Sequence, residues 1–375
     1  MYLKAKNILF ACCAMAFLLF RRRVHGLPQR ILIVQNAKLG DMVCTTPLFR
    51  AIKKTYPSTH LTVMGNVINK ELLAGHPYVD EYIVAPQGFV ALVRELRREK
   101  FDFATTVGPD LQALCALMCA RIPHVVVPRI VGGHSPYETS VYKFLSRFVT
   151  TANYHMRSYM PREYLKLLEP LDIRTNDARK ELAVADSAVL RVKELLAQKG
   201  YNPEKDLIVG IAPSAGAHKI KSWGAERFAR AAEYLAHKHN AVIAIIAAKG
   251  EKDDVEKMIS ALPASVRSID LCGALSIEEL KAVVSLLSLY ISSDTGPIHI
   301  AEAFDTPSVD VLGAVDEHEI SIASPRHRVV FHPKRGEPAL HVMSASVYDP
   351  AEVRRQTDMV TVEMVVKEIE GALND

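Results

Sequence analysis

Short apolar runs alternate with longer, helix-patterned stretches along most of the chain. Residues 31–34 (ILIV) are wholly apolar, as is typical of strands that are buried on both faces. A polar turn follows at 36–41, and a helical pattern at 45–54 ends before Tyr56 and Pro57. The same approach predicts further elements, which are strands at 61–64, 81–84, 103–107 and 125–127 and a helix at 89–100. Because strand and helix alternate, the pattern predicts βα units in a parallel sheet.

The second half of the chain repeats this scheme. The predicted strands are 207–212, 242–247, 289–292 and 309–312, and the predicted helices are 187–199, 225–237, 278–285 and 361–373. Residues 131–180 are less regular, and we expect a long loop or helices of a substrate face there. A chain of 375 residues fits two domains of ordinary size. We therefore predict an α/β protein with one domain at 30–185, a second at 186–360 and a C-terminal helix at 361–375.

The first 29 residues form a separate segment. Residues 8–20 are an unbroken apolar run, which is preceded by Lys4 and Lys6 and followed by three arginines at 21–23. The run is shorter than the ~20 residues that a spanning helix needs, and the arginines directly after it argue against cleavage as a signal peptide. We predict that it rests in or on an anionic membrane face. A disordered leader or an artefact of the start site is the alternative.

Charge is distributed unevenly along the chain. The net charge is +4, but residues 1–200 carry 28 Lys and Arg against 16 Asp and Glu, whereas residues 201–375 carry 18 against 26. The basic half favours an anionic partner such as a phosphorylated lipid, a sugar acid or nucleic acid, although a solvated basic face is also compatible with it.

The six cysteines form no CxxC pair and no His cluster has metal-ligand spacing. A reducing compartment is therefore favoured, and a zinc site is not expected.

Three segments with candidate chemistry each follow a predicted strand, where α/β folds place their ligands. The first, residues 38–47, has the sequence KLGDMVCTTP. Its Gly40 belongs to a turn, and Asp41 stands at the mouth of a helix. Asp41 can cap that helix, or it can project into a ligand site as a general base.

The second segment, residues 213–223, has the sequence PSAGAHKIKSW. Its small residues let backbone N–H groups approach phosphate oxygens, and Lys219 and Lys221 can supply positive charge. The segment matches neither a P-loop nor a GxGxxG motif, and a solvated loop explains it equally well. Trp223, the only tryptophan, is interpreted as a packing residue.

The third segment, residues 292–301, has the sequence SSDTGPIHIA. Thr295 or Gly296 can cap a helix, and Pro297 is expected at its first position. The free N–H groups at such a helix start bind anions and suit a diphosphate. His299 would face the same anion site, or it is a structural residue.

Together these segments resemble glycosyltransferase family 9, the lipopolysaccharide heptosyltransferases. The matching stretches, in the family's order and spacing, are ILIVQNAKLGDMVCTTPLFRAIKKTYP, PSAGAHKIKSW and SDTGPIHIAEAFDTP, so the resemblance covers about residues 30–313. It implies a GT-B fold, in which two Rossmann-like domains with parallel sheets face a central cleft. It also implies inverting transfer of a heptose or a related sugar from a nucleotide donor such as ADP-heptose to a lipopolysaccharide core or a similar surface glycan. No metal ion and no cofactor are expected.

The resemblance also assigns roles to individual residues. Asp41 is implied as the base that takes the proton from the acceptor hydroxyl, and Lys221 as the residue that neutralises the donor diphosphate. Lys38, Gly40 and Thr45 are expected to contact the acceptor, which binds the first domain. The nucleotide sugar binds the second domain, where the expected contacts are Ser214, Gly216, Lys221, Glu251, Asp294, Thr295, Gly296 and His299. A lysine and a helix N-terminus aimed at the departing diphosphate would stabilise the transition state more than the ground state.

The expected partners are a nucleotide sugar and an anionic glycolipid or oligosaccharide acceptor, with the protein cytoplasmic and peripherally bound to the inner membrane. Nucleic acid is not expected.

Residues 313–318 depart from the family pattern. Relatives continue here with Phe, Gly and Pro, whereas this chain has GAVDEH, which leaves the donor sugar and the nucleotide base of the donor open. The alternatives are a nucleotide-sugar epimerase of GT-B fold and a non-catalytic glycolipid-binding homologue. A dinucleotide oxidoreductase is disfavoured because no GxGxxG follows the first strand.

Overall fold

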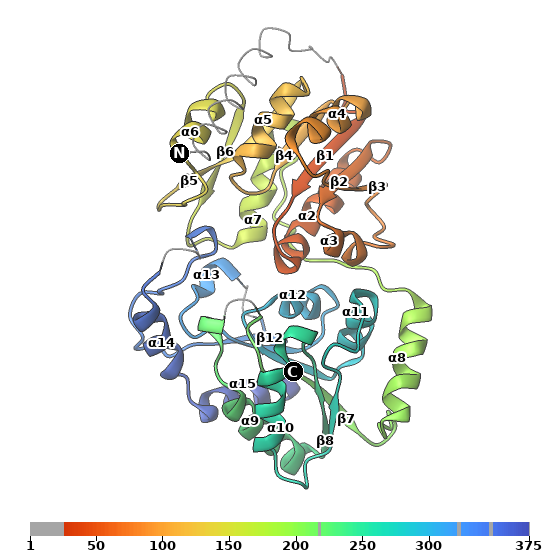
Figure 1. Ribbon diagram of the computed structural model, residues 1–375, viewed down its shortest axis with the longest axis vertical. Helices are drawn as coiled ribbons and strands as arrows, with labels where there is room; N and C mark the ends of the chain where they lie inside the picture. The colour runs from red at the N-terminus through yellow and green to blue at the C-terminus, as the bar shows by residue number, and fades with distance from the viewer. Residues whose placement is uncertain (1–25, 217–218, 321–323, 345–347, 375) are drawn as a thin grey trace. The chain divides into compact units, whose positions relative to one another are not determined.

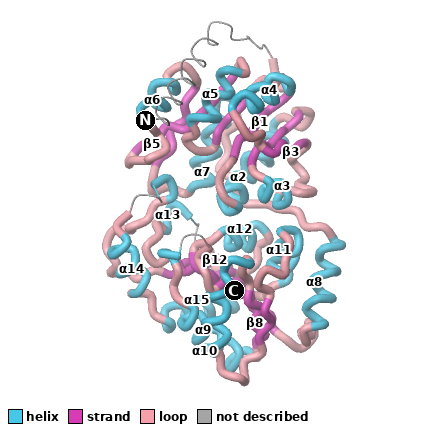
Figure 2. Tube along the Cα trace, viewed as in Figure 1, coloured by secondary structure: helices cyan, strands magenta, loops and turns pink. Residues whose placement is uncertain are grey.

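The computed structural model of the chain describes residues 26–216, 219–320, 324–344 and 348–374. The apolar run at 8–20, which was predicted to rest on a membrane, lies outside these residues. The chain divides into two compact units, Met1–Lys180 (unit 1) and Glu181–Asp375 (unit 2). Each unit is a parallel sheet covered by helices (Figures 1 and 2). The predicted domain boundary, between residues 185 and 186, falls just after this division.

Unit 1 is built on a six-stranded parallel sheet with the order β3-β2-β1-β4-β5-β6. Its strands are β1 (Arg30–Gln35), β2 (His60–Gly65), β3 (Glu81–Val84), β4 (Phe103–Thr106), β5 (His124–Val131) and β6 (Thr150–His155). Its helices are α2 (Leu39–Thr55), α3 (Val67–Leu72), α4 (Phe89–Glu99), α5 (Leu111–Cys119), α6 (Ser140–Ser146), α7 (Met160–Leu165) and the 3-10 helix η1 (Lys166–Leu171). In the register of the central strand, Ile31 pairs with Leu61 of β2 and with Phe103 of β4.

Unit 2 has a second six-stranded parallel sheet, with the order β12-β11-β10-β7-β8-β9. Its strands are β7 (Leu207–Ala212), β8 (Ala241–Ile245), β9 (Ser268–Asp270), β10 (Leu289–Ser293), β11 (Ser308–Val311) and β12 (His327–Val330). Its α-helices are α8 (Asp186–Gln198), α9 (Ala225–His239), α10 (Lys252–Ala261), α11 (Ile277–Leu286), α12 (Gly296–Ala303), α13 (Glu317–Ile320), α14 (Pro350–Asp358) and α15 (Val362–Asn374). Its 3-10 helices are η2 (Lys219–Lys221), η3 (Lys249–Glu251) and η4 (Val342–Ser344).

Each unit has its own hydrophobic core. In unit 1, α4 and α5 cover one face of the sheet with buried side chains such as Leu96 and Leu114. In unit 2, apolar side chains of α9 and α15 form a core that also contains the fully buried Trp223. The Trp223 ring packs edge-on against Phe228, and its Nε1 donates to the Val360 carbonyl at 2.8 Å. The interpretation of Trp223 as a packing residue is confirmed, and the C-terminal helix α15 is an integral part of unit 2.

The two sheets share the strand order of a dinucleotide-binding Rossmann fold. In this order the winding reverses between the first and fourth strands of each sheet, which are β1 and β4 in unit 1 and β7 and β10 in unit 2. Ligands of open α/β sheets bind beyond the carboxyl ends of strands at such a switch point. The predicted α/β fold with two Rossmann-like, parallel-sheet domains is confirmed. The loops that follow these four strands are therefore the expected ligand-binding loops.

Three strands, β6, β9 and β12, were not predicted from the apolar pattern. Each lies at an edge of its sheet, and their sequences, TTANYH, SID and HRVV, include polar or charged residues. An edge strand faces solvent along one side, so it needs no continuous apolar run. For this reason residues 131–180, which were expected to form a loop or helices, also contain a strand.

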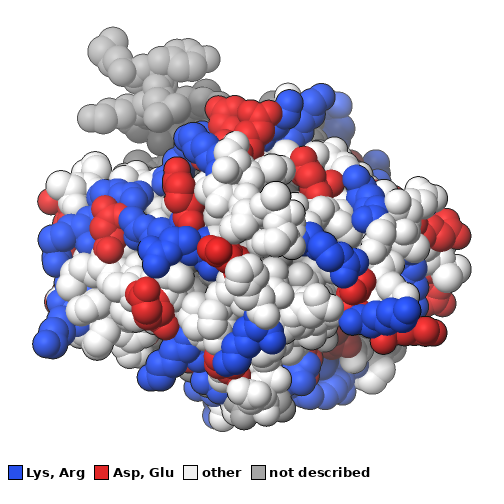
Figure 3. Space-filling model, turned by 90° about the horizontal axis from the view of Figure 1, so that it is seen from below, with Lys and Arg blue, Asp and Glu red and all other residues white. Residues whose placement is uncertain are grey.

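The described part of unit 1 is basic. Residues 26–180 carry 20 Lys and Arg against 13 Asp and Glu. Figure 3 shows a different face, seen from below the view of Figure 1, on which basic side chains lie interspersed with acidic ones. Among the helices that the structure describes, none combines the length and the apolar character that crossing a bilayer requires.

Candidate functional site

Asp41 lies in the first turn of α2, directly after the central strand β1 of unit 1. The helix begins at Leu39 with Lys38 as its N-cap, so it starts earlier than the predicted Thr45. The Lys38 backbone N–H donates to Asp41 Oδ2 at 3.2 Å. A carboxylate at this position satisfies an N–H group that has no partner within the helix and is stabilised by the helix dipole. Asp41 therefore does help to cap the helix, from the third helical position, and it is only partly buried.

The predicted acceptor contacts around Asp41 differ in exposure. Lys38 is exposed, whereas Gly40 and Thr45 are buried. The Thr45 hydroxyl donates to the Asp41 carbonyl at 2.7 Å and accepts from Gln35 Nε2 at 3.2 Å. Thr45 therefore fixes the first turn of α2, and a direct contact of Thr45, Gly40 or Lys38 with an acceptor stays a prediction.

The switch point of unit 1 includes further polar residues that sequence reasoning missed. Asn36, after β1, donates through Nδ2 to Asp110 Oδ2 at 3.4 Å. Asp110 follows β4 and caps α5, because its Oδ1 accepts from the Ala113 N–H at 2.9 Å. Asn66 Nδ2 donates to the Ala37 carbonyl at 2.9 Å and so holds the loop after β1. The position of these residues in the sequence could have identified them as candidates, since Asn36, Asn66 and Asp110 each follow a predicted strand.

The predicted phosphate loop of unit 2 follows β7. Ser214 is buried, and its hydroxyl oxygen accepts from the Gly216 N–H at 3.3 Å. Gly216 has a φ of +62°, a left-handed conformation that favours glycine. A Cβ at Gly216 would lie 3.7 Å from Glu251 Oε1, and Glu251 Oε2 accepts from the Ala248 N–H at 2.6 Å. The structure thus brings Ser214, Gly216 and Glu251 together from the ends of two adjacent strands.

Lys221 and Asp294 form an ion pair at the switch point of unit 2, in which Asp294 is buried and Lys221 is half-buried. Lys221 Nζ lies 2.6 Å from Asp294 Oδ2, and the two side chains are 15% and 7% exposed. The loop is also held by Trp223, whose backbone N–H donates to Ser293 Oγ at 3.2 Å. Burial alone would raise the pKa of the Asp294 carboxyl, but Lys221 and His299 outweigh that effect and lower it. Asp294 is therefore an ionised carboxylate that fixes the position of the lysine.

Helix α12 starts directly after this pair. Thr295 is its N-cap, Gly296 is its first residue and Pro297 its second, so Pro297 lies one position later than predicted. The Thr295 side chain makes no capping hydrogen bond, and its hydroxyl instead donates to Ser292 Oγ at 3.4 Å. His299 is buried in the first turn, with Nδ1 2.9 Å from Glu302 Oε2. Lys221 and the N-terminus of α12 both carry positive charge or partial charge, so together they are suited to bind an anion.

One further cluster combines carboxylates with imidazoles. Asp316, Glu319 and His341 offer three ligand atoms that all lie within 4.8 Å of one another, as do Asp316, Glu317 and His318. Burial opposes ionisation of Asp316, but hydrogen bonds from His341 and His318 hold its pKa well below the usual range. These groups could hold a metal ion. Such a site was not predicted from the sequence, because His341 comes from a distant segment. The expectation that no metal takes part stays a prediction.

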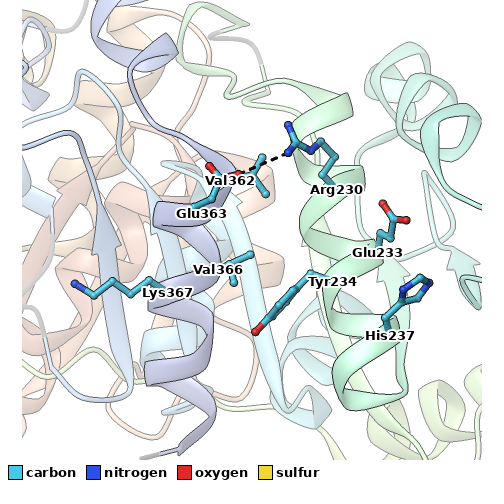
Figure 4. A pocket seen from close by; sticks show the side chains of 8 residues that line it. All are labelled: Arg230, Glu233, Tyr234, His237, Val362, Glu363, Val366 and Lys367. Carbon is cyan, nitrogen blue, oxygen red and sulfur yellow. Dashed lines mark ion pairs between the residues drawn. The ribbon is translucent and has the colours of Figure 1, made fainter.

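A surface cavity of about 580 Å³ lies between α9 and α15 (Figure 4). Tyr234 and Val366 line it, and Arg230 pairs with Glu363 across it at 3.6 Å. None of the predicted site residues is among those that line this cavity. It is therefore distinct from the switch point of unit 2.

Comparisons with known proteins agree with this geometry. The family described as Glycosyltransferase family 9 (heptosyltransferase) matches residues 89–346. The lipooligosaccharide heptosyltransferase 2 of Haemophilus influenzae is 25% identical over 302 residues, which cover 76% of this chain and 83% of that protein.

Two solved structures share the fold. A family 9 glycosyl transferase from Veillonella parvula has a TM-score of 0.72 at 18% identity, covering 92% of this chain and 97% of that one. The E. coli ADP-heptose lps heptosyltransferase II has a TM-score of 0.69 at 17% identity, covering 92% and 98%. These similarities support the GT-B fold of the chain.

Proposed function

Because the chain belongs to glycosyltransferase family 9, we propose that it transfers a heptose or a closely related sugar from ADP-heptose to a lipopolysaccharide core or a similar surface glycan. The family makes the protein a glycosyltransferase. The names of the H. influenzae and E. coli relatives support heptose as the sugar, ADP as the nucleotide and lipopolysaccharide as the acceptor. The family assignment disfavours an epimerase, which needs no separate acceptor.

The observation that carries this proposal is the ion pair between Lys221 and the buried Asp294 at the start of α12. Breaking the bond between the sugar and the nucleotide leaves negative charge on the departing diphosphate. A lysine that is held in place and the N–H groups of a helix start stabilise that charge as it develops. In this proposal Ser214, Gly216, Glu251, Thr295, Gly296 and His299 line the same donor site. Such a site can act without a metal ion.

Asp41 is proposed as the general base of an inverting displacement. Its carboxylate takes the proton from the acceptor hydroxyl, whose oxygen attacks the anomeric carbon on the face opposite the diphosphate. The bond between that carbon and the diphosphate oxygen breaks, and its electron pair leaves with ADP. The product carries the sugar with inverted anomeric configuration. The position of Asp41 in the first turn of α2, directly after the central strand β1, supports this role, because ligands of open α/β sheets bind beyond the carboxyl ends of such strands.

The acceptor is proposed to bind unit 1 at a membrane surface. The excess of Lys and Arg in the described part of unit 1 supports an acceptor with phosphates or acidic sugars. Peripheral binding to the cytoplasmic face of the inner membrane would bring the enzyme to a lipid-linked acceptor.

The test is transfer from ADP-heptose to a heptose-deficient lipopolysaccharide, followed by mass spectrometry of the glycolipid and NMR of the new anomeric centre. Wild type should add heptose with inversion, in the presence of EDTA as well as without it. Asp41→Asn should lower kcat by roughly 10²- to 10⁴-fold, the usual contribution of a general base, and should keep its affinity for ADP within about twofold.

The matched control is Asp110→Asn, which also changes a capping aspartate at the switch point of unit 1. Asparagine is a good N-cap, so this variant should retain most activity. If wild type neither transfers heptose nor binds ADP, the proposed function is wrong. If Asp41→Asn retains more than about a tenth of the activity, the function stands but Asp41 is not its base.

A further inference from the structure

Asp310 is a buried carboxyl group on β11 that the proposed function does not use. In the register of the sheet, Asp310 lies beside Ser292 of β10. Side chains alternate along a strand, and the neighbours Val309, Val311 and Ile291 belong to the core formed with α9 and α15. Asp310 and Ser292 therefore face the opposite side of the sheet. On that side α12 connects β10 to β11 and contacts both strands.

Asp310 receives no hydrogen bond from the part of the chain that the structure describes. The residue is only 3% exposed, and among the described residues neither carboxyl oxygen has a hydrogen-bond partner. An ionised carboxylate that is buried without a partner is strongly unfavourable, so such a group takes up a proton instead. Asp294 provides the contrast, because it is equally buried but has Lys221 as a partner.

Five titratable side chains act on Asp310 from the elements around it. They are Asp294 after β10, Lys221 of η2, His299 and Glu302 of α12, and Tyr290 of β10. Burial first, and then the carboxylates of Asp294 and Glu302, raise the pKa of Asp310 well above its usual range, against the opposite effects of His299 and Lys221. The pKa of Asp294 is lowered and that of Asp310 is raised, so at a pH between the two values Asp294 is ionised and Asp310 is protonated.

We propose that Asp310 is a positioning residue of the donor site, which holds one proton between the sheet and α12 and so limits the negative charge beneath the diphosphate. This inference rests on the donor site proposed above. If Asp310 lost its proton, it would add a third carboxylate to Asp294 and Glu302 around Lys221. Like charges in a poorly solvated site repel strongly. The donor diphosphate and an ionised Asp310 would therefore oppose each other.

This arrangement couples donor binding to the proton of Asp310. Binding of the anionic donor should increase the affinity of Asp310 for its proton. By linkage, the loss of this proton should weaken donor binding. Affinity for ADP should therefore fall as pH rises through the pKa of Asp310. Asp310→Asn has the size of the acid form and cannot ionise, so it should escape this loss.

The raised pKa of Asp310 also predicts how the stability of the protein changes with pH. Because the pKa of Asp310 is raised in the folded protein, its contribution to stability is fully present below the ordinary aspartate pKa of about 3.9 and is lost as pH rises through the folded value. The melting temperature of Asp310→Asn should therefore increase relative to wild type as pH rises. The variant should fold, since it removes a buried group that can become an unpaired charge.

Infrared spectroscopy of the full chain tests the proton without any donor. At pH 7, wild type should show the carbonyl band of a protonated carboxyl group that is missing from Asp310→Asn. The matched control is Asp316→Asn, because Asp316 is fully buried but is kept ionised by His318 and His341. This control should retain the band. The proposal is overturned if wild type and Asp310→Asn have the same carboxyl bands at pH 7.

Calorimetric titration with ADP tests the link to the donor site. The Kd for ADP is measured for wild type and for Asp310→Asn from about pH 6 to about pH 9.5. At the lowest pH the ratio of the wild-type Kd to the variant Kd should be within about twofold of unity. As pH rises this ratio should increase, by at most tenfold per pH unit, which is the limit for the loss of one proton. Taking the ratio cancels the titration of ADP itself. A ratio that stays constant while the infrared band disappears overturns the positioning role. If ADP does not bind wild type, the proposed donor site is wrong and the positioning role with it, whatever the infrared spectra show.

Discussion

At the scale of single residues, the site of unit 2 depends on which charges have partners. Asp294 is buried, Lys221 is half-buried and the two side chains lie 2.6 Å apart, so each compensates the other's loss of hydration. Removing one member of such a pair leaves a buried charge without compensation, whereas removing both does not. The pair therefore orients the lysine more than it stabilises the fold. This distinction can be measured.

A double-mutant cycle should separate the two effects. Lys221→Met is expected to lower the free energy of unfolding by about 3–5 kcal/mol, because Asp294 then loses its counterion. The double variant Lys221→Met with Asp294→Asn should recover much of this loss but should not bind ADP. Urea unfolding and calorimetric titration give the two readouts. If the two single-variant losses simply add, the residues do not act as a pair.

The lowered pKa of Asp294 also predicts how this pair responds to acid. Its contribution to stability is present above the ordinary aspartate pKa of about 3.9 and is lost as pH falls through the lower folded value. Asp294→Asn should lack this component of acid sensitivity, so the difference in melting temperature between the two proteins should shrink as pH falls below about 4. A difference that grows in acid would contradict the assignment of Asp294 as an ionised group.

At the scale of elements, α2 shows how a helix tolerates a proline near the site. Pro47 lies inside α2 and has no N–H to donate to the carbonyl of Val43. The Thr46 hydroxyl donates to that buried carbonyl instead, at 2.8 Å. The helix therefore continues through the proline and keeps Asp41 in its first turn. Thr46 and Pro47 therefore have a structural role within the helix.

Thr46→Val tests this role, because valine has the shape of threonine but no hydroxyl. The variant should lose about 1–3 kcal/mol of unfolding free energy, the cost of a buried polar group without a partner. Thr46→Ser keeps the hydroxyl and should lose less. Chemical denaturation measures both. Equal losses in the two variants would mean that packing of the methyl group, rather than the hydrogen bond, is the important contact.

At the scale of the whole molecule, the two units divide the chemistry between them. All of the proposed donor residues belong to unit 2, and Asp41 belongs to unit 1. Helices α14 and α15, at the end of the chain, also belong to unit 2, where Val365 and Ile369 complete its core. Unit 2 therefore contains both a full core and a full set of donor residues.

Residues 181–375 expressed alone should consequently fold and bind ADP. We expect cooperative melting by circular dichroism and a Kd for ADP within about tenfold of the full chain, which is a difference of 1.4 kcal/mol. The fragment should have no transferase activity, since it lacks Asp41. A matched fragment that ends at residue 360 lacks α15 and should not fold. If the longer fragment also fails to fold, unit 1 is needed for the stability of unit 2.

Much of this protein follows from its sequence by itself. Central strands such as β1 and β7 are recognisable because a strand that is buried on both faces must be apolar throughout. The loops after them are recognisable because glycine, proline and capping residues act locally. The α/β class, the two domains and the segments that hold Asp41, Lys221 and Asp294 were therefore predictable. The edge strands were not, because an edge imposes no continuous apolar run.

Only the tertiary structure decided which of these residues are partners. Lys221 and Asp294 are separated by 73 positions in the chain, and Asp310 is read from the sequence as an ordinary strand residue. That Asp310 has no hydrogen-bond partner among the described residues depends on the register of β10 and β11 and on the helix that crosses them. Local patterns determine where strands and helices form, because backbone preferences and burial act over short segments. The charge that each buried group carries depends on neighbours brought from elsewhere in the chain, so only the folded arrangement determines it.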